Sequence, residues 1–229
     1  MSVHFLTGAG AGIGAALAAR LQARGDDLIL LARSDARAAE LGERFPAART
    51  VVADLSAPGE LAAAVAAQEL PTRLDSLIHV AGVVDLGPVA ELTVAKWSSQ
   101  LDVNLVAPAE LTRLLLPALR AAKGQVVFVN SGAGLRAAPE WAAYAASKHG
   151  LKALADSLRA EEAAHGVRVS SVYPGRTATA MQERVHEQEG RDYDPAAFID
   201  AGSVVTSILT VLDLPRDAQI PDLTIRPGV

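Results

Sequence analysis

The sequence contains no cysteine among its 229 residues, which excludes disulfides, thiolate zinc sites and a cysteine nucleophile. No apolar run approaches the roughly 20 residues of a membrane-spanning helix. There is no block of basic residues of the kind that binds nucleic acid. The N-terminus lacks a basic segment followed by a long apolar run, so we expect no signal peptide. We therefore expect a cytoplasmic protein with no membrane or nucleic-acid partner and no metal site.

The residues that are present suit one folded unit. Half of them are hydrophobic, 21% are charged with both signs mixed, and the formal net charge is -5. A chain of this length can bury one substantial core. It has no repeat, low-complexity tract or interdomain linker, so we predict a single domain over residues 1–229. The segment 181–201 is charged and weakly periodic, which makes it a candidate substrate lid.

Short apolar runs alternate with helical patterns along the chain. The expected strands are 3–8, 28–34, 49–55, 74–82, 124–134, 167–175 and 220–226, and the expected helices are 12–25, 35–45, 58–69, 93–121, 142–164 and 203–212. Pro108 and Pro117 are expected to kink or break the long helix. This alternation predicts an α/β fold: a doubly wound, Rossmann-type parallel sheet of about seven strands, flanked by helices. Its ligand should bind beyond the carboxyl ends of the strands.

A glycine loop, TGAGAGIG at residues 7–14, joins the first expected strand to the first expected helix. Gly8, Gly12 and Gly14 allow a sharp turn and a close approach to a ligand, and the helix start offers free N–H groups. A tight turn without a ligand would give the same string. The position between strand and helix favours a dinucleotide pyrophosphate site, to which Thr7 and Ile13 also belong.

The second expected strand ends in LARS, residues 31–34, without the acid that an NAD site usually places there. The guanidinium of Arg33 can instead bind a 2′-phosphate through two contacts, so we predict NADP, with NAD less favoured. The alternative is that Arg33 stacks on adenine or lies in solvent. Asp54, followed by Leu55, can accept a hydrogen bond from the adenine amino group or cap the next turn.

Tyr144 and Lys148 stand four residues apart in AAYAASKHG, an alanine-rich stretch typical of a helix. Residues at this spacing lie on one face of a helix, so the phenol and the ammonium can meet. The plain alternative is a surface lysine that covers a half-buried tyrosine.

Several segments together resemble the short-chain dehydrogenase/reductase family in its NADP-preferring form: TGAGAGIG, HVAG (79–82), Asn104 in LDVNL, Ser131, YAASK (144–148) and the Pro-Gly segment of YPGRTATAM (173–181). Their order and intervals agree with the family, with 27 residues from Asn104 to Ser131 and 13 from Ser131 to Tyr144. The resemblance covers essentially the whole chain. His79 and Val80 depart from the common Asn-Asn-Ala-Gly, and we expect His79 to be a packed strand residue.

The resemblance implies an NAD(P)-dependent enzyme that transfers a hydride between its cofactor and a carbonyl or alcohol substrate. Tyr144 would be the acid or base, and Ser131 would bind the substrate oxygen. Lys148 would lower the pKa of Tyr144 toward the working range and hold the nicotinamide ribose. Asn104 would hold a water that relays protons.

The resemblance also adds residues to the cofactor site. They are Ala81 and Gly82 beside the adenosine, Pro174 and Gly175 beside the nicotinamide, and Thr177 and Thr179, of which Thr179 is preferred as the partner of the carboxamide. Structural alternatives stay open for three of the predicted residues. Ser131 can be a turn serine, Asn104 a helix-kink residue and Thr179 a helix N-cap.

The predicted substrate pocket is mostly apolar and holds Val84, Leu86, Leu135, Trp141 and the segment 181–193. It predicts a hydrophobic ketone or secondary alcohol, although Arg184, His186 and Arg191 can instead recognise an anionic substrate. The family resemblance implies a homodimer or homotetramer. Two other functions are weighed: a non-catalytic dinucleotide-binding sensor or scaffold, and a methyltransferase, which would need an acid where Arg33 stands.

Overall fold

Seven parallel strands form one sheet in the order β3-β2-β1-β4-β5-β6-β7 in the computed structural model, which describes residues 1–228. The strands are β1 (Val3–Thr7), β2 (Asp27–Ala32), β3 (Arg49–Val52), β4 (Ser76–His79), β5 (Gln125–Val129), β6 (Arg168–Pro174) and β7 (Asp222–Ile225). Thr7 at the end of β1 lies opposite both Leu31 and His79, so neighbouring strands end at the same edge. The predicted Rossmann-type fold is confirmed.

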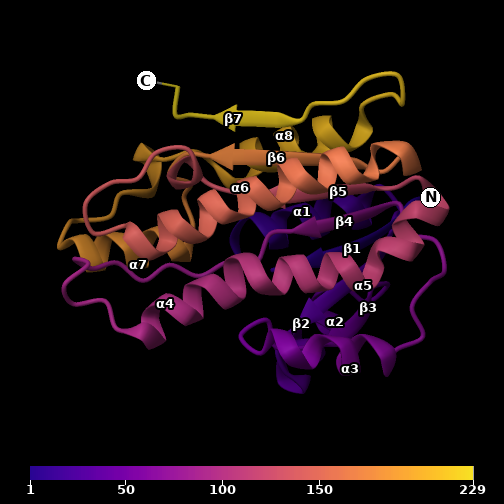
Figure 1. Cartoon of the computed structure of the whole chain (residues 1–229), viewed down its shortest axis with the longest axis horizontal. Coiled ribbons are helices and arrows are strands. Elements are labelled where there is room, and N and C mark those ends of the chain that lie inside the picture. Colours follow the sequence, from indigo (N-terminus) through magenta and orange to yellow (C-terminus); the bar gives the residue numbers. More distant parts are fainter. Residues whose placement is uncertain (229) are drawn as a thin grey trace.

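The helices connect the strands and cover both faces of the sheet (Figure 1). They are α1 (Gly12–Ala23), α2 (Asp35–Arg44), α3 (Leu61–Ala66), α4 (Val94–Leu101), α5 (Ala107–Ala122), α6 (Ala142–Glu162), α7 (Ala180–Glu189) and α8 (Ala201–Asp213), with short 3-10 turns at Pro58–Glu60, Gly132–Gly134, Ala163–His165 and Pro195–Ala197. Over residues 1–228, no helix combines the length and the apolarity that a bilayer crossing requires.

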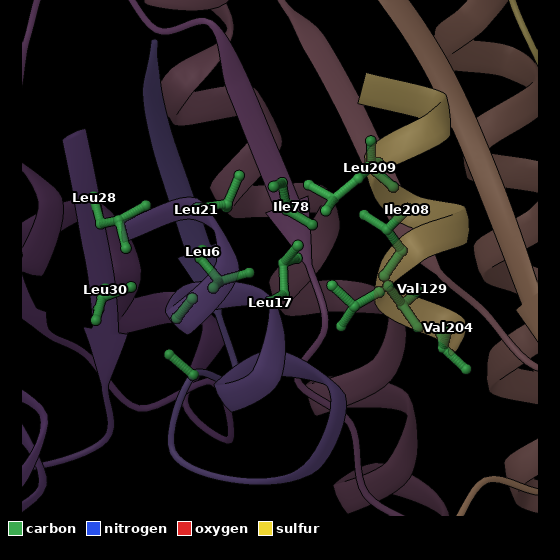
Figure 2. Packing of buried hydrophobic residues seen from close by; sticks show 14 of the residues in the cluster. Leu6, Leu17, Leu21, Leu28, Leu30, Ile78, Val129, Val204, Ile208 and Leu209 are labelled. Carbon is green, nitrogen blue, oxygen red and sulfur yellow. The ribbon is translucent and has the colours of Figure 1, made fainter. Parts of the chain in front are cut away.

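Each face of the sheet buries its own apolar core, because successive side chains of a strand point to opposite faces. Leu6 packs with residues of α1 and α8 on one face, and Figure 2 shows Leu17 and Ile208 meeting the strands there. Its neighbour Phe5 packs with residues of α3, α5 and α6 on the other face, Leu111 among them. The two cores hold the sheet rigid beneath its carboxyl edge.

The long helix expected at 93–121 is continuous but irregular. A π-helical turn at Asp102–Val106 joins α4 to α5, directly before Pro108. The ring of Pro108 would clash with the carbonyl four residues earlier, and the wider π turn relieves that clash. Of the kink or break expected at Pro117, the break does not occur, because Pro117 lies inside α5 without ending it.

Two other expected boundaries need correction. The strand expected at 124–134 ends at Val129, and Gly132–Gly134 form a 3-10 turn that begins at Ser131. The candidate lid at 181–201 is also more regular than its weak periodicity predicted, since α7 fills its first half. Thr179 caps α7 by accepting a hydrogen bond from the backbone N–H of Gln182, at 3.3 Å. α7 lies at the end of the molecule toward which β6 and β7 point (Figure 1).

Leu17 is fully buried in the core between the sheet and the helices α1 and α8. Replacing it with alanine removes apolar contacts and leaves a cavity, so Leu17→Ala should lower the free energy of unfolding by about 2–5 kcal/mol. Urea denaturation measures the change. The matched control is Val94→Ala at a position that is 81% exposed, where a loss within about 0.5 kcal/mol is expected. Equal losses in the two variants would contradict this assignment of the core.

Candidate active site

A cavity of 880 Å³ lies at the carboxyl edge of the sheet and extends beneath α7. Most of the predicted site residues line it: Gly8, Gly12, Ile13, Gly14, Arg33, Asp54, Leu55, Ala81, Gly82, Ser131, Tyr144, Lys148, Pro174, Gly175, Thr177 and Thr179. Thr7 and Asn104 lie behind its wall. Segments that are distant in the sequence therefore meet at one concave site, as expected of a doubly wound sheet.

The glycine loop depends on residues without a side chain at two positions. Gly8 has a φ of +79°, and a Cβ there would lie 2.7 Å from the backbone nitrogen of Ala81. A Cβ on Gly14 would lie 2.1 Å from the carbonyl oxygen of Gly8. The N-cap of α1 is Ala11, whose side chain accepts no hydrogen bond from the first turn. The helix start thus keeps backbone N–H groups directed at the cavity, which suits a pyrophosphate.

Thr7 organises this edge from behind. It is 1% exposed, and its hydroxyl oxygen accepts hydrogen bonds from the backbone N–H groups of Val80 and Ala81, each at 3.1 Å. These bonds fix the segment that follows β4 against the glycine loop. The position of Thr7 is therefore structural, and it supports the cavity wall formed by Ala81 and Gly82.

Tyr144 and Lys148 are both buried on α6, at 7% and 4% exposure. The alternative of a surface lysine covering a half-buried tyrosine is therefore wrong. Burial raises the pKa of Tyr144, and a hydrogen bond with Ser131 offsets part of that rise. Burial lowers the pKa of Lys148 to about 8. The predicted fall of the Tyr144 pKa does not occur in the chain alone, because desolvation of the phenolate dominates.

The ammonium of Lys148 is oriented by the end of β5. Its Nζ donates to the carbonyl oxygen of Val129 at 3.1 Å and lies 5.9 Å from the centre of the Tyr144 ring. Asn130, the next residue, donates through Nδ2 to the carbonyl oxygen of Lys148 at 3.1 Å. Its Oδ1 accepts from the backbone N–H of Ser131 at 2.9 Å. Asn130 thus joins the Ser131 turn to α6.

Asn130 was not predicted as a site residue, although it stands directly before Ser131 in NSGAG. Gly134 makes room for it, because a Cβ at Gly134 would lie 2.4 Å from Asn130 Oδ1. Ser131 itself begins the 3-10 turn, and its hydroxyl oxygen accepts from the backbone N–H of Ala133 at 3.2 Å. The turn-serine alternative is therefore observed, and Ser131 lines the same cavity as Tyr144.

Asn104 lies in the π-helical turn and is 1% exposed. Its Nδ2 donates to the Val83 carbonyl at 2.9 Å and to Ser147 Oγ at 3.0 Å, while its Oδ1 accepts from Val83 N–H at 2.9 Å. The side chain thus has partners within the fold. The backbone carbonyl of Asn104 lacks its regular helical donor, because the residue four positions later is Pro108. The backbone carbonyl oxygen of Asn104, rather than its side-chain amide, is therefore the group that can accept a hydrogen bond from a water.

His79 is a packed strand residue, as predicted. Its ring stacks on Phe128 with 5.0 Å between the ring centres, and its Nε2 lies 3.0 Å from the hydroxyl of Thr112. Burial, with a smaller effect from the Lys148 charge, lowers the pKa of His79 to about 3. The ring therefore stays neutral and serves packing, which agrees with its place inside the sheet.

The predicted adenosine end of the cavity holds an exposed Arg33 and a cation that sequence reasoning missed. Arg37 lines the cavity from the first turns of α2, and its Nη2 lies 2.9 Å from where a Cβ on Gly10 would stand. Asp54 caps the following turn, since its Oδ1 accepts from the backbone N–H of Ser56 at 2.8 Å. The sequence signal for Arg37 was its place in the first turn of the expected helix, four residues after Arg33.

The Pro-Gly segment brings Thr179 to the glycine loop, since a Cβ on Gly12 would lie 3.0 Å from Thr179 Cγ2. Its hydroxyl is both the cap of α7 and a donor to the Thr177 carbonyl at 3.3 Å. Thr177 is buried, and its own hydroxyl donates to the Gly175 carbonyl at 3.0 Å. Both threonines line the cavity, and both hydroxyls have partners within the fold, so the N-cap alternative for Thr179 is observed.

Three predicted pocket residues, Trp141, Val84 and Met181, line the cavity and form its apolar substrate wall. The ring of Trp141 stands edge-on to that of Tyr144, with 5.7 Å between their centres. Two predicted pocket residues lie elsewhere. Leu86 is buried, and its backbone N–H donates to Gln188 Oε1 on α7 at 2.7 Å. Leu135 is 42% exposed and does not line the cavity.

Some residues of the candidate lid line the cavity, and others pack behind it. Arg184 lines the cavity, whereas His186 is buried, bonded to Gln182 and packed against Tyr193 and Phe198. Arg191 lies outside the cavity lining and is 4.0 Å from a Glu189 oxygen. Of the three residues considered for anion recognition, Arg184 alone lines the cavity among the residues that the structure describes.

Comparison with known proteins agrees with this geometry. The sequence pattern of the family described as short chain dehydrogenase matches residues 2–190. Oxidoreductase UcpA of Salmonella typhimurium is 34% identical over 93% of this chain and 81% of its own length. A solved short chain dehydrogenase of Escherichia coli CFT073, complexed with NADPH, is 28% identical, with a TM-score of 0.84 over 97% of this chain and 95% of its own. A 4-hydroxyisoleucine dehydrogenase complexed with NADH is 26% identical, with a TM-score of 0.81 over 98% and 96%.

The buried ammonium of Lys148 should destabilise the fold below pH 8. Its pKa is about 8 in the fold, against 10.5 as the ordinary value, so between these values the unfolded chain binds more protons. Stability therefore rises with pH across that window. Lys148→Met should raise the free energy of unfolding at pH 7 by on the order of 3 kcal/mol, and most of that gain should be gone near pH 10.

Urea denaturation at both pH values measures this gain, with Lys96→Met as the control for an exposed lysine that pairs with Asp85. The control should show no gain at either pH. A Lys148→Met variant that is destabilised equally at both pH values would show that the ammonium carries no burial cost.

Proposed function

This chain belongs to the short chain dehydrogenase family, and we propose that it is an NADP(H)-dependent oxidoreductase that interconverts a hydrophobic ketone and the corresponding secondary alcohol. The observation that carries the proposal is the convergence of Ser131, Tyr144 and Lys148 on one cavity that the glycine loop also lines. A non-catalytic sensor would need the loop but not this convergence. The cofactor supplies the hydride.

In reduction, Tyr144 donates its phenolic proton to the carbonyl oxygen as the alkoxide develops. Its raised pKa keeps the phenol protonated at neutral pH, which suits the acid role. Ser131 binds the same oxygen through its hydroxyl and stabilises the developing charge. Lys148 uses one ammonium proton for Val129 and keeps two for the nicotinamide ribose and for stabilising the phenolate that forms.

Reprotonation of Tyr144 proceeds through Lys148 and a water held by Asn104. The side chain of Asn104 is already hydrogen-bonded to Val83 and Ser147, so its backbone carbonyl is the proposed water ligand. A Cβ on Gly82 would lie 3.2 Å from Asn104 Oδ1 and 3.8 Å from Lys148 Nζ. The space that glycine leaves there connects the two residues. The homo-oligomer and the cytoplasmic location stay predictions from the sequence.

NADP is the proposed cofactor because of the charges at the adenosine end. Arg33 and Arg37 both line this part of the cavity, and the end of β2 carries no acid that would repel a phosphate. Arg33 provides the parallel N–H donors that a 2′-phosphate accepts. Arg37 pairs with Glu40 through Nη1 and directs its Nη2 toward the glycine loop. Relatives of solved structure include NADP-bound and NADPH-bound enzymes, which supports this choice.

Tyr144→Phe removes the proposed proton donor and keeps the ring that packs on Trp141. The rate of NADPH oxidation against a panel of aryl ketones should fall by about 10²–10⁴-fold. NADPH affinity, measured by fluorescence titration, should change little. Tyr193→Phe is the control, since Tyr193 lies outside the cavity lining. Full activity in Tyr144→Phe would refute the acid–base role.

Arg33→Ala should remove most of the preference for NADPH. Loss of a charged contact to the 2′-phosphate lowers kcat/KM for NADPH by about 10–100-fold and leaves kcat/KM for NADH unchanged. Steady-state kinetics with both cofactors measures the ratio. Arg44→Ala, in the last turn of the same helix α2 that carries Arg37, is the control. An unchanged ratio in Arg33→Ala would remove the charge argument for NADP.

A further inference from the structure

The cavity concentrates positive charge in a chain that is acidic overall. The formal net charge is -5, yet six basic side chains and one acidic side chain line the cavity within residues 1–228. The basic ones are Arg33, Arg37, Arg136, Lys148, Arg176 and Arg184, and the acidic one is Asp54. A low-dielectric cleft lined by one sign of charge attracts ligands of the opposite sign.

The proposed cofactor accounts for only part of this charge. Arg33 and Arg37 lie at the adenosine end, and Lys148 is committed to Tyr144 and the ribose. Three guanidinium groups remain, and they come from the segments that also carry the substrate wall. Arg136 follows the turn that begins at Ser131, Arg176 follows Pro174 and Gly175, and Arg184 is on α7.

Arg176 is neutralised within the fold. Its Nη1 donates to Glu189 Oε2 at 2.8 Å, and the Glu189 side chain is 10% exposed. The guanidinium carbon of Arg176 also lies 5.7 Å from the ring centre of Trp141. Arg176 therefore braces Trp141 and the C-terminal end of α7, and its charge already has a partner.

Arg136 and Arg184 have no carboxylate partner among the residues that the structure describes. Their backbones are nonetheless fixed. Arg136 N–H donates to the Gly132 carbonyl at 3.1 Å, in the turn that carries Ser131. α7 is held at its start by the Thr179 cap and near its end by the bond from Leu86 N–H to Gln188. Arg136 and Arg184 thus extend from backbone segments that are held in place, and neither guanidinium is paired with a carboxylate there.

We propose that the substrate is a carbonyl compound that also carries a carboxylate, which Arg136 and Arg184 bind. The apolar part of the molecule packs on Trp141, Val84 and Met181, with its carbonyl at Tyr144 and Ser131. A guanidinium offers two parallel N–H donors that match the two oxygens of a carboxylate. The reaction adds a hydride and the Tyr144 proton to the carbonyl and leaves the carboxylate unchanged. This assignment rests on the proposed function and narrows its substrate class.

The test compares aryl oxo acids, with two to four methylene groups between ketone and carboxylate, with their methyl esters. The wild-type enzyme saturated with NADPH should favour at least one acid over its ester by about tenfold in kcat/KM, as expected for one charged contact. The double variant Arg136→Gln, Arg184→Gln should lose this preference through a higher KM for the acid. Its kcat/KM for the ester should stay within about twofold.

The matched control is Arg191→Gln, an exposed arginine outside the cavity lining, which should keep the acid preference. The Kd of NADPH is measured for each variant. A fall in NADPH affinity of the double variant equal to the loss for the acid would assign the two arginines to the cofactor instead. A wild-type enzyme that turns over the esters as well as the acids would overturn the carboxylate proposal and leave the proposed function standing.

If no ketone of either series is turned over, the proposed function fails, and calorimetric titration of the NADPH-loaded protein still decides the binding claim. Acids that bind no more tightly than their esters would refute it there too. The proposal is supported if an acid binds with a lower Kd than its ester and this difference is lost in the double variant but kept in Arg191→Gln. Added salt should weaken acid binding more than ester binding, since the contact is between charges.

Discussion

The site depends on a reciprocal pair of hydrogen bonds between the end of β5 and the middle of α6. The ammonium of Lys148 donates to the carbonyl of Val129, and the amide of Asn130 donates to the carbonyl of Lys148. Each bond restrains the other, because both join the same two segments. Ser131 is carried by the β5 end and Tyr144 by α6, so the pair fixes the distance between the hydroxyl and the phenol. The stiffness of each element then comes from the two apolar cores.

This arrangement places two polar groups where water is largely excluded. Burial raises the pKa of Tyr144 and lowers that of Lys148, so both are driven toward their neutral forms. The two pKa values move apart, so the ammonium of Lys148 is the stronger acid and readily returns a proton to the phenolate that Tyr144 leaves after reduction. Because of the same desolvation, the chain is less stable than it would be with two apolar side chains at these positions. Stability is therefore given up at the position where the chemistry needs two groups with separated pKa values.

Much of the fold and most of the motifs were predictable, because both depend on residues that are close together in the sequence. Strands and helices follow from short-range periodicity, and the glycine loop and the Tyr144–Lys148 spacing are contiguous strings. The π-helical turn before Pro108 was not predictable in detail, since a proline in a helix can kink it, end it or widen one turn. Asn130 was missed because its role lies in partners that are distant along the chain.

Arg37 and Arg136 were missed for a related reason, and Arg184 was named only together with His186 and Arg191. In sequence, these three arginines, which line the cavity, look like the solvated faces of a helix start, a loop and a lid, and nothing local separates them from Arg191. They differ from Arg191 because their backbone segments face the cavity in the folded chain. The Pro174–Gly175 segment and the Ser131 turn bring separate cations to one cavity, whereas the acids of this acidic chain stay mostly outside it.

That separation of charge has a consequence for how the site works. A phosphorylated dinucleotide brings several negative charges into the cleft, and they compensate the cations at the adenosine end. Once those are compensated, the remaining positive potential is concentrated at the substrate end, near Trp141 and Tyr144. A substrate carboxylate is attracted to that end, whereas the alkoxide at Tyr144 is stabilised by Ser131 and Lys148, on which acid and ester depend alike. Binding the phosphorylated cofactor and binding a substrate carboxylate are thus two effects of one uneven distribution of arginine.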